Sequence, residues 1–445
     1  MIMKSAPITR RTCLKQALLA GAAFTILPSH SRGRAAPSKR VHVAMIGVGR
    51  QGVGVNLRTF LGMENVRVTA VCDVDRERLA YAKKMVDESY GDTDCRAFPD
   101  FREALETPEL DAVMISTPDH WHAIQALMAI NKGLHVCCEK AMTRFFEEGR
   151  ALADAAANSD VVFRLDSECR SHAYMTRTAD LAMNGYLGNI QRIEVGLPRE
   201  EGGGFGNAEP MQTPEHLDYN MWLGPAPERP YTADRVHRNH ARTGAPYGRP
   251  GWIRISDYAA GMISNWGGHL LDVANLINRS SHTGPVRIEG TGAFPGPGEL
   301  WDTMTDCEIS CQFANGLVMD CRMDRPYIRV VGDEGWIQAH WHSRGGLRAH
   351  DNRILRTEFR DSDERVPTRS DKQDFIDAIV KGTPVMIDAE AGHRVNSQCL
   401  LGIAAMKSGV ALEWDPDAEK ILNHPEAAGE MAGTYRKPWD LKRFT

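Results

Sequence analysis

The sequence lacks the cysteine patterns that mark zinc sites and disulfide frameworks. Its ten cysteines include no CxxC pair and no Cys/His set with the spacing of zinc ligands. Cys307, Cys311 and Cys321 lie in strand-like sequence, where small buried side chains are the usual role. We therefore expect no metal site and no disulfide framework, and a single isolated bridge is left open.

Long apolar runs, internal repeats and an excess of basic charge are absent as well. The apolar run from Ala17 to Leu27 is too short to span a bilayer as a stable anchor. The 445 residues carry a formal net charge of −5, which makes nucleic acid and anionic membrane surfaces poor candidates as partners. The chain is too long for one ordinary core, so its length suggests two domains.

The first 36 residues differ from the rest of the chain. A basic start, the apolar run and small residues near Ala36 form the three-part pattern of an export signal. Arg10-Arg11 followed by Leu14-Lys15 resembles the twin-arginine motif, although Cys13 stands where that motif prefers phenylalanine. We expect residues 1–36 to direct the chain, through the twin-arginine export machinery, to the periplasm without a membrane anchor. A disordered basic tail is the alternative. Because this segment holds six basic residues and no acidic ones, its removal moves the net charge from −5 to −11.

Strand and helix signals alternate between residues 40 and 165. Apolar strands are expected at 41–49, 66–75, 110–118 and 134–140, with helices at 77–88 and 121–133. Short, almost continuously apolar strands that alternate with helices predict an α/β fold with a doubly wound parallel sheet. We therefore expect residues 40–165 to form a Rossmann domain.

The remaining residues, 166–445, show mostly strand signals. Strands are expected at 190–198, 286–294, 306–313, 316–323, 327–341 and 354–360, with helices at 267–278 and 372–382. Asn315-Gly316 favours the type I′ turn of a hairpin. We expect a second α/β domain with a large, mostly antiparallel open sheet and a C-terminal tail at 410–445. Its stretch 199–255 is long for a loop, so it is either functional or an oligomer contact.

A glycine-rich turn follows the first expected strand, and Asp73 ends the second one. The turn fits the GxGxxG pattern, which lets a pyrophosphate approach the N-terminus of a helix, and Asp73 can accept hydrogen bonds from both ribose hydroxyls. Its carboxylate would repel a 2′-phosphate, so NAD is expected rather than NADP, although Arg76 and Arg78 lie close enough to soften that preference. A glycine turn that serves packing alone is the alternative. The residues of the turn expected to bind the cofactor are Gly47, Gly49, Arg50, Gln51 and Gly52.

Two further strand ends carry polar residues. Thr117, Pro118 and His122 follow the third expected strand, and Glu139 and Lys140 end the fourth. Because the carboxyl ends of parallel strands face the ligand, we expect these five residues near the cofactor. A lysine beside the nicotinamide can hydrogen-bond a substrate hydroxyl and steer its proton. A helix-capping histidine and a surface ion pair between the two neighbours are the alternatives.

The stretch NWGGHLLD adds a third polar group. Asn265 is expected in a turn before a helix whose first turn carries His269 and Asp272, which are three residues apart and can share a face. Histidine is the usual group for moving a hydroxyl proton near neutral pH. A buried structural histidine fits the sequence equally well.

These motifs, in this order, resemble the Gfo/Idh/MocA oxidoreductases, enzymes of the glucose–fructose oxidoreductase and inositol dehydrogenase type. The resemblance covers essentially everything after residue 40, including YNMWLGPAPERPY at 219–231, and it is closest to the exported, twin-arginine branch. It implies a Rossmann domain that binds NAD or NADP. It also implies a sugar or cyclitol substrate, and a C-terminal domain that binds this substrate and forms a homodimer or homotetramer through its open sheet.

The resemblance also assigns roles by position. Lys140 matches the lysine of the family's Glu-Lys-Pro motif, and His269 matches the catalytic histidine. Arg170 falls where related sequences often carry an arginine, so the resemblance implies a substrate contact there, with Asn265 and Asp272 as further weak substrate candidates.

Two positions depart from the family's pattern. Asn265 stands where an aspartate is usual; an amide can orient a hydroxyl but cannot accept its proton, so acid–base work falls to His269 and Lys140. Ala141 stands where a proline is usual, and the family's lysine–proline bond is often cis. The isomer of the Lys140–Ala141 bond is therefore left open.

We thus expect an exported, NAD-dependent oxidoreductase that transfers hydride between the nicotinamide and a hydroxyl-bearing carbon of a sugar or cyclitol. The periplasm has no obvious free NAD pool, so the nucleotide is expected to be tightly bound. A glycoside-cleaving enzyme that oxidises a ring hydroxyl transiently ranks second, because the Thr-His-Gly motif associated with that branch is absent. A catalytically silent nucleotide- or sugar-binding protein ranks third.

Overall fold

The computed structural model describes residues 40–199, 205–236, 250–341 and 346–445. The export signal expected over residues 1–36 lies outside these ranges, as does part of the long loop expected at 199–255. No helix within the described ranges is long and apolar enough to cross a membrane.

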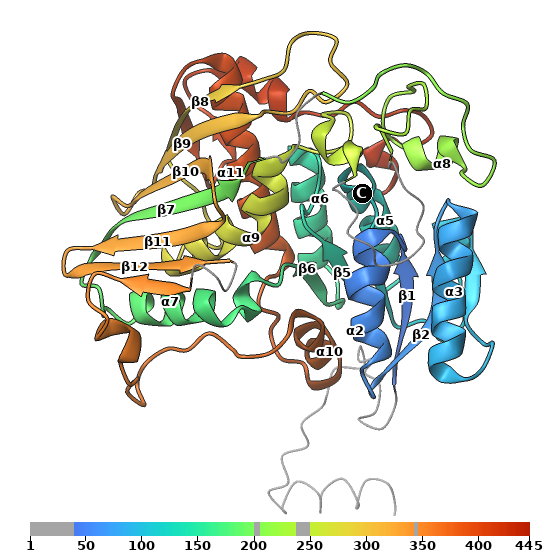
Figure 1. Ribbon diagram of the computed structural model, residues 1–445, viewed down its shortest axis with the longest axis horizontal. Helices are drawn as coiled ribbons and strands as arrows, with labels where there is room; N and C mark the ends of the chain where they lie inside the picture. Colours follow the sequence, from blue (N-terminus) through green and yellow to red (C-terminus); the bar gives the residue numbers. More distant parts are fainter. Residues whose placement is uncertain (1–39, 200–204, 237–249, 342–345) are drawn as a thin grey trace, which may run out of the picture. The chain divides into compact units, whose positions relative to one another are not determined.

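Six parallel strands form the first sheet, in the order β3-β2-β1-β4-β5-β6 (Figure 1). Consecutive residues of β1 enter two different cores: Val43 and Met45 pack on one face of the sheet, and Ala44 and Ile46 on the other. Burial on both faces explains why these strands are almost continuously apolar. The doubly wound parallel sheet predicted from the sequence is therefore confirmed. The strands are β1 Val41–Ile46, β2 Val66–Cys72, β3 Arg96–Phe98, β4 Ala112–Ile115, β5 His135–Glu139 and β6 Phe163–Asp166.

Helices from both halves of the chain cover this sheet. Among the larger ones, α5 (Asp119–Asn131) and α6 (Phe146–Ala157) contribute to one core, and α3 (Arg76–Tyr90) to the other. The helix α10 (Asp371–Lys381), far along the chain, adds Phe375 and its neighbours to the core that contains α3. The C-terminal half therefore completes the packing of the N-terminal sheet. The remaining helical segments of this region are the π-helix Gly52–Leu57, α2 Arg58–Leu61 and α4 Phe101–Ala104.

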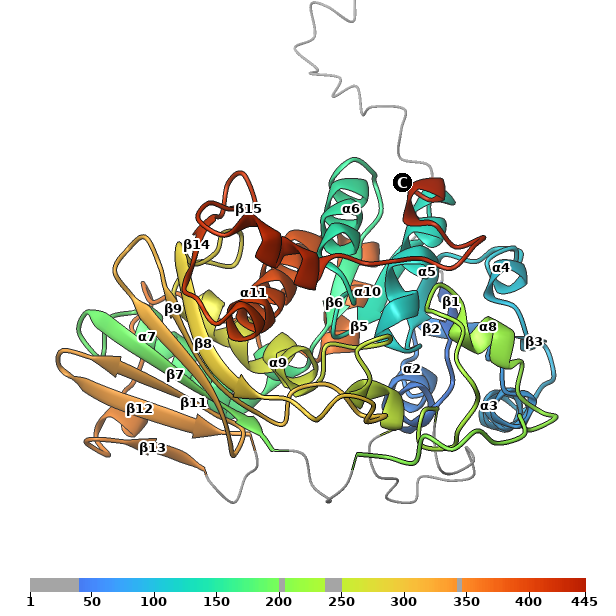
Figure 2. The ribbon, with the colours of Figure 1, turned by 90° about the horizontal axis from the view of Figure 1, so that it is seen from above.

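The second sheet has nine strands in the order β13-β12-β11-β7-β10-β9-β8-β14-β15. Among the described strands of this second sheet, only β7 and β10 pair in parallel, so the sheet is mostly antiparallel, as predicted. The helices α7 (Ala173–Met183), α9 (Met262–Ile277) and α11 (Ala389–Ser408) lie along one face (Figure 2). The strands are β7 Ile190–Pro198, β8 Arg287–Ala293, β9 Asp306–Gln312, β10 Val318–Asp324, β11 Tyr327–Gly332, β12 Gly335–His340, β13 Leu347–Ala349, β14 Leu412–Asp415 and β15 Lys420–Ile421.

The structure corrects three sequence-based expectations. The stretch 327–341 is a hairpin of β11 and β12 rather than one strand. The expected strand at 354–360 is wrong: its residues are all at least partly exposed, and it contains only the 3-10 turn Ile354–Arg356. The helix expected at 267–278 begins earlier, at Met262, because Gly261 with φ 77° provides the change of direction. Asn265 therefore lies inside α9 and not in a turn before it.

The cysteines in the described part of the chain form no disulfide. The nine between Cys72 and Cys399 are all free and buried. The described ranges also contain no group of His, Cys, Asp and Glu side chains that could hold a metal ion.

A buried ionic cluster joins β6 to α10. Lys372 contacts Asp166 and lies 2.7 Å from Asp371, while Arg164 donates to Asp374 at 2.8 Å and to Asp166 at 3.0 Å. Burial alone would lower the pKa of Lys372, but the two carboxylates outweigh it and raise the pKa. The cluster therefore holds the end of β6, and the loop that follows it, against α10.

Replacing Lys372 by Met should destabilise the protein by about 3–5 kcal/mol, because the buried carboxylate of Asp166 would lose its ammonium partner and keep only Arg164. Guanidinium unfolding measures this change. Lys381→Met is the matched control, since Lys381 lies on the same helix with a side chain that is 61% exposed. Equal losses of stability in the two variants would contradict the prediction.

Candidate active site

The candidate site lies at the carboxyl edge of the first sheet, between β1 and β4. The strand order reverses at this pair, which is where ligands bind in open α/β sheets. Gly47 follows β1 with φ 83°, and a Cβ there would lie 2.7 Å from the backbone of Ser116 and Thr117. A Cβ on Gly52 would lie 2.2 Å from the carbonyl oxygen of Gly47. The turn is therefore as tight as a pyrophosphate-binding loop requires, and Arg50 and Gln51 open the helical segment that follows it.

Asp73 is tied to this turn. One carboxylate oxygen accepts from the backbone N–H of Val48 and the other from that of Asp75, both at 2.9 Å. Burial raises the pKa of Asp73, and the nearby Arg78 opposes that effect. The Arg78 guanidinium also lies beside Gly49, where an added Cβ would be 2.7 Å from it. The carboxylate and the glycine turn thus form one rigid unit that fits a nucleotide.

The loop after β4 is held from within the protein. Thr117 donates its hydroxyl to Gln125 at 2.7 Å, and Pro118 precedes the first residue of α5. His122 is fully buried, and its ring nitrogens lie 2.8 Å from the carbonyl oxygens of Thr117 and Ala141. His122 therefore links the loop after β4 to the residue that follows Lys140. A direct contact of its ring with the cofactor stays a prediction.

Glu139 and Lys140 have separate surroundings. Glu139 is buried and accepts from the amide of Asn56 at 2.9 Å, so it does not form the surface ion pair considered as an alternative. Asn56 also donates to Ser116 at 2.9 Å, which connects the glycine-loop helix to the ends of β4 and β5. Lys140 is half-buried and has no hydrogen-bond or ion-pair partner within the described ranges. The Lys140–Ala141 peptide bond, left open by the sequence, is cis.

The helix α9 brings His269 to the same place. A Cβ on Gly268 would lie 3.2 Å from the Cβ of Lys140, so the helix backbone packs directly against that lysine. The next residue, His269, is buried, and its Nδ1 lies 2.8 Å from the hydroxyl of Ser167 in the loop after β6. Burial, assisted by the positive charge of Lys140, holds the pKa of His269 well below its ordinary value. The imidazole is therefore neutral near pH 7 and can accept a proton.

Two tryptophans enclose this histidine. The ring of Trp341 lies 5.4 Å from that of His269, and the ring of Trp266 lies 5.9 Å from it. Trp341 follows β12, so the second sheet contributes directly to the surroundings of the site. These rings pack close to His269, and burial of the histidine is the main cause of its lowered pKa.

The three weaker substrate candidates are placed differently from one another. Arg170 and Asp272 form a buried two-bond ion pair, at 2.8 and 2.6 Å, and Arg170 also donates to the carbonyl oxygen of Met386 at 2.5 Å. Most of the hydrogen-bonding capacity of this pair is therefore used within the protein. Asn265 is half-buried on α9, one turn before His269. A substrate contact by any of the three stays a prediction.

Sequence reasoning missed four contributors: Asn56, Ser167, Trp341 and Glu168. Glu168 is half-buried just after β6; burial raises its pKa, and Lys140 is among the charges that oppose the effect. It therefore places a carboxylate within electrostatic reach of Lys140. A buried polar residue in an otherwise apolar helix could have singled out Asn56. No local pattern marks the other three.

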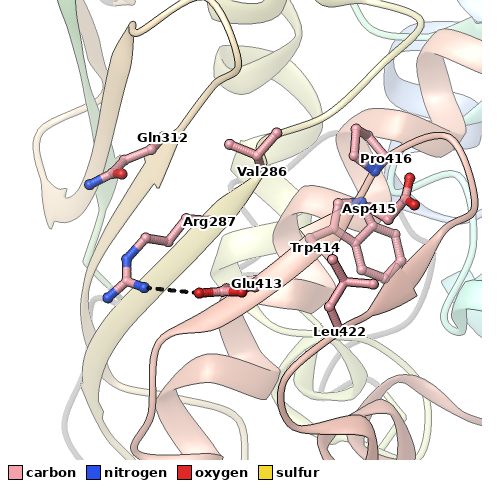
Figure 3. Close-up of a pocket in the computed structure, with 8 residues that line it drawn as sticks. All are labelled: Val286, Arg287, Gln312, Glu413, Trp414, Asp415, Pro416 and Leu422. Carbon is pink, nitrogen blue, oxygen red and sulfur yellow. Dashed lines mark ion pairs between the residues drawn. The ribbon is translucent and has the colours of Figure 1, made fainter.

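A separate hollow lies on the second sheet. Figure 3 shows its eight lining residues, which come from β8, β9, β14 and the segments beside them, with Arg287 and Glu413 paired at 4.0 Å. Trp414 belongs to the lining but is buried. None of the predicted site residues lies there, so we place the chemistry at the edge of the first sheet.

The parallel sheet, its strand order and the tight glycine turn after β1 define a Rossmann-type nucleotide-binding fold. Two family models match the chain: "Oxidoreductase family, NAD-binding Rossmann fold" over residues 41–167, and "Oxidoreductase family, C-terminal alpha/beta domain" over residues 201–441. The chain therefore belongs to the Gfo/Idh/MocA oxidoreductase family, as the order of its motifs predicted.

Individual relatives are more distant. The D-glucoside 3-dehydrogenase of Escherichia coli is 29% identical over 153 residues, which are 34% of this chain and 42% of that protein. A glycosyl hydrolase family 109 protein of Stenotrophomonas maltophilia is 25% identical over 334 residues, 70% of each chain. The solved structure of GenD2 from gentamicin A biosynthesis, in complex with NAD, is 18% identical with a TM-score of 0.62, and covers 86% of this chain and 99% of that one. The chain spans less than half the length of the Escherichia coli relative and of several other curated relatives.

Replacing Trp341 by Ala should raise the pKa of His269 towards its ordinary value of about 6.5, because water would reach the buried ring and stabilise its charged form. NMR titration of the His269 ring, assigned with His269→Gln, measures the shift. Trp336→Ala is the control, since Trp336 lies on β12 against Arg329. An unchanged titration of His269 in Trp341→Ala would show that this ring does not keep water from the histidine.

Proposed function

We propose that this protein is an NAD-dependent oxidoreductase that transfers hydride between the nicotinamide and a hydroxyl-bearing carbon of a sugar or cyclitol. The observation that carries the proposal is the convergence of Lys140 and the neutral His269 at the carboxyl edge of the sheet, beside the nucleotide-binding turn. Bound at that turn, the nicotinamide ring supplies the hydride chemistry. The residues of the chain supply the proton chemistry.

The hydrogen bond of His269 to Ser167 defines which nitrogen can react. With Nδ1–H donated to the Ser167 hydroxyl, Nε2 keeps its lone pair and can take the proton of a substrate hydroxyl. The ammonium of Lys140 can donate to the same hydroxyl oxygen and stabilise the negative charge that develops there. Asn265 can orient a neighbouring hydroxyl but cannot accept its proton.

The choice of cofactor and substrate has separate support. Asp73, with its carboxylate bonded to the glycine turn, favours the ribose hydroxyls of NAD and disfavours a 2′-phosphate. The similarity to a D-glucoside 3-dehydrogenase supports a carbohydrate substrate. We extend the proposal to a twin-arginine signal over residues 1–36, a periplasmic location and a homodimer or homotetramer formed through the open sheet.

Tight binding of the nucleotide is supported by the segment 216–223, which is bonded to the loop that follows β2. The backbone N–H of Asp218 donates to the carbonyl oxygen of Val74 at 3.0 Å. The backbone N–H of Arg76 donates to the carbonyl oxygen of His216 at 2.9 Å. Val74 directly follows Asp73, so these bonds attach the segment to the loop that would hold the ribose. One end of the segment is thereby attached to the loop after β2.

The same segment is also attached to α5. Its short helix α8 (Tyr219–Leu223) ends beside the indole of Trp121, whose N–H lies 3.1 Å from the carbonyl oxygen of Trp222. Trp121 belongs to the first turn of α5, next to Pro118. From the C-terminal tail, Arg436 donates to the carbonyl and side-chain oxygens of Asn220 at 2.8 and 2.7 Å. The segment is thus held at both ends, and we infer that a nucleotide bound at the glycine turn leaves more slowly while the segment stays attached.

The variants Lys140→Met and His269→Ala should each lower turnover at least about 100-fold while leaving the nucleotide bound, because they remove proton transfer and not the cofactor site. The assay is a screen of sugars, cyclitols and uronates with the purified holoprotein, followed by nicotinamide absorbance. Lys132→Met is the control, since Lys132 is an exposed lysine of the same domain. Unchanged turnover in both site variants would refute the assignment.

The double variant Arg436→Ala, Trp121→Phe should release bound NAD about tenfold faster. The segment 216–223 would lose the hydrogen bonds that the Arg436 guanidinium and the Trp121 indole N–H donate to it. Nucleotide retained after gel filtration, followed during a chase with unlabelled NAD, gives the rate. Arg353→Ala is the control, with a side chain that is 92% exposed. If the wild-type protein yields no nucleotide on denaturation and binds none when it is added, NAD is not its cofactor.

A second candidate function is glycoside cleavage through transient oxidation of a ring hydroxyl. It is favoured by the similarity to a glycosyl hydrolase family 109 protein over 70% of the chain. Glu168, within electrostatic reach of Lys140, would supply a carboxylic acid that donates a proton to the leaving group. Release of the aglycone without net formation of NADH in the same screen would favour this function over the dehydrogenase.

A further inference from the structure

His122 joins two loops of the candidate site through one fully buried ring. Its Nε2 lies 2.8 Å from the carbonyl oxygen of Thr117, which follows β4, and its Nδ1 lies 2.8 Å from that of Ala141. Ala141 directly follows Lys140. The imidazole therefore spans from the end of one strand to the residue next to the candidate catalytic lysine.

Both partners of this ring can only accept hydrogen bonds. A neutral imidazole carries a single N–H, so it can satisfy one of the two carbonyl oxygens and would turn the lone pair of its other nitrogen towards the second. Such a contact at 2.8 Å, away from water, is unfavourable. The doubly protonated imidazolium donates to both carbonyl oxygens, and it is the state that fits this geometry.

A counter-charge is available three residues earlier on α5. Asp119 is buried; its burial raises its pKa to about 6, and the positive groups around it, His122 first among them, oppose the effect. Its carboxylate is therefore ionised near pH 7, at helical spacing i, i+3 from His122. The other titratable groups that face this pair are His120 on the same helix, Glu139 and Lys140 at the end of β5, and Arg144 in the turn that follows.

We propose that His122 is a positioning residue, held as the imidazolium with Asp119 as its counter-ion, which sets the position of Lys140 by donating to the carbonyl oxygen of Ala141. Both charges are buried, so neither the pair nor its hydrogen bonds compete with bulk water. The protonation state of His122 is independent of the proposed function. The expected effect on turnover rests on the proposed function.

His120 provides the contrast within the same helix. It is also buried, but its Nε2 lies 3.1 Å from a single carbonyl oxygen, that of Trp222, and its Nδ1 has no partner within the described ranges. Burial lowers the pKa of His120 to about 3. Two buried histidines, two residues apart, are thus expected in different protonation states.

NMR of the ¹⁵N-histidine-labelled holoprotein tests the protonation state directly. Near neutral pH, His122 should show two protonated ring nitrogens and His120 only one. His122→Gln and His120→Gln assign the signals. A single protonated nitrogen on His122 at this pH would overturn the proposal, and no enzymatic activity is needed to see it.

Kinetics test the role in positioning. His122→Gln can donate to only one of the two carbonyl oxygens, so kcat should fall at least about tenfold with KM and retained NAD changed less than threefold. Asp119→Asn removes the counter-ion, so NMR should show a single protonated nitrogen on its His122 and its kcat should fall as well, whereas His120→Gln should keep the wild-type kcat. An unchanged kcat in His122→Gln, or two protonated nitrogens on His122 in Asp119→Asn, would refute the role. If wild type turns over no substrate in the screen, the proposed function fails, and the NMR result still decides the state of His122.

Discussion

The close packing of Gly268 against Lys140 is the contact on which the candidate site depends. A side chain at position 268 would begin 3.2 Å from the Cβ of the lysine, below the usual separation of non-bonded carbon atoms. Because Gly268 has no side chain, α9 can approach the end of β5. The next residue, His269, then lies at the edge of the first sheet. The proton chemistry proposed here needs groups from both halves of the chain, and this contact brings them together.

Most polar groups around that contact are already engaged with a partner. Asn56 holds Glu139, Ser167 holds His269, and Arg170 is paired with Asp272. Buried polar groups that are bonded in this way keep one orientation, which is the condition for preorganised catalysis. Lys140 differs, since it is half-buried and has no such partner within the described ranges. Its ammonium is therefore the group left available to a ligand, and the neutral His269 beside it is the group left available to a proton.

The two halves of the chain also support each other away from the site. The helix α10 fills one face of the first sheet with Phe375, and its Lys372 neutralises Asp166 at the end of β6. The segment 216–223 connects the loop that follows β2 to the first turn of α5. Elements of the C-terminal half thus stabilise the edge of the first sheet, so a nucleotide bound there would be coupled to the packing of the whole described unit.

The sequence by itself determined the parallel sheet, the glycine turn with Asp73, and Lys140 and His269 as the candidate reactive pair. Strand burial on both faces, the tight turn and the order of the motifs all leave local patterns that can be read along the chain. Only the tertiary structure decided which groups meet. Ser167 and His269 are 102 residues apart, as are Arg170 and Asp272, and Trp341 reaches His269 from a different sheet. Such contacts depend on how helices and sheets pack, and no spacing along the chain records them.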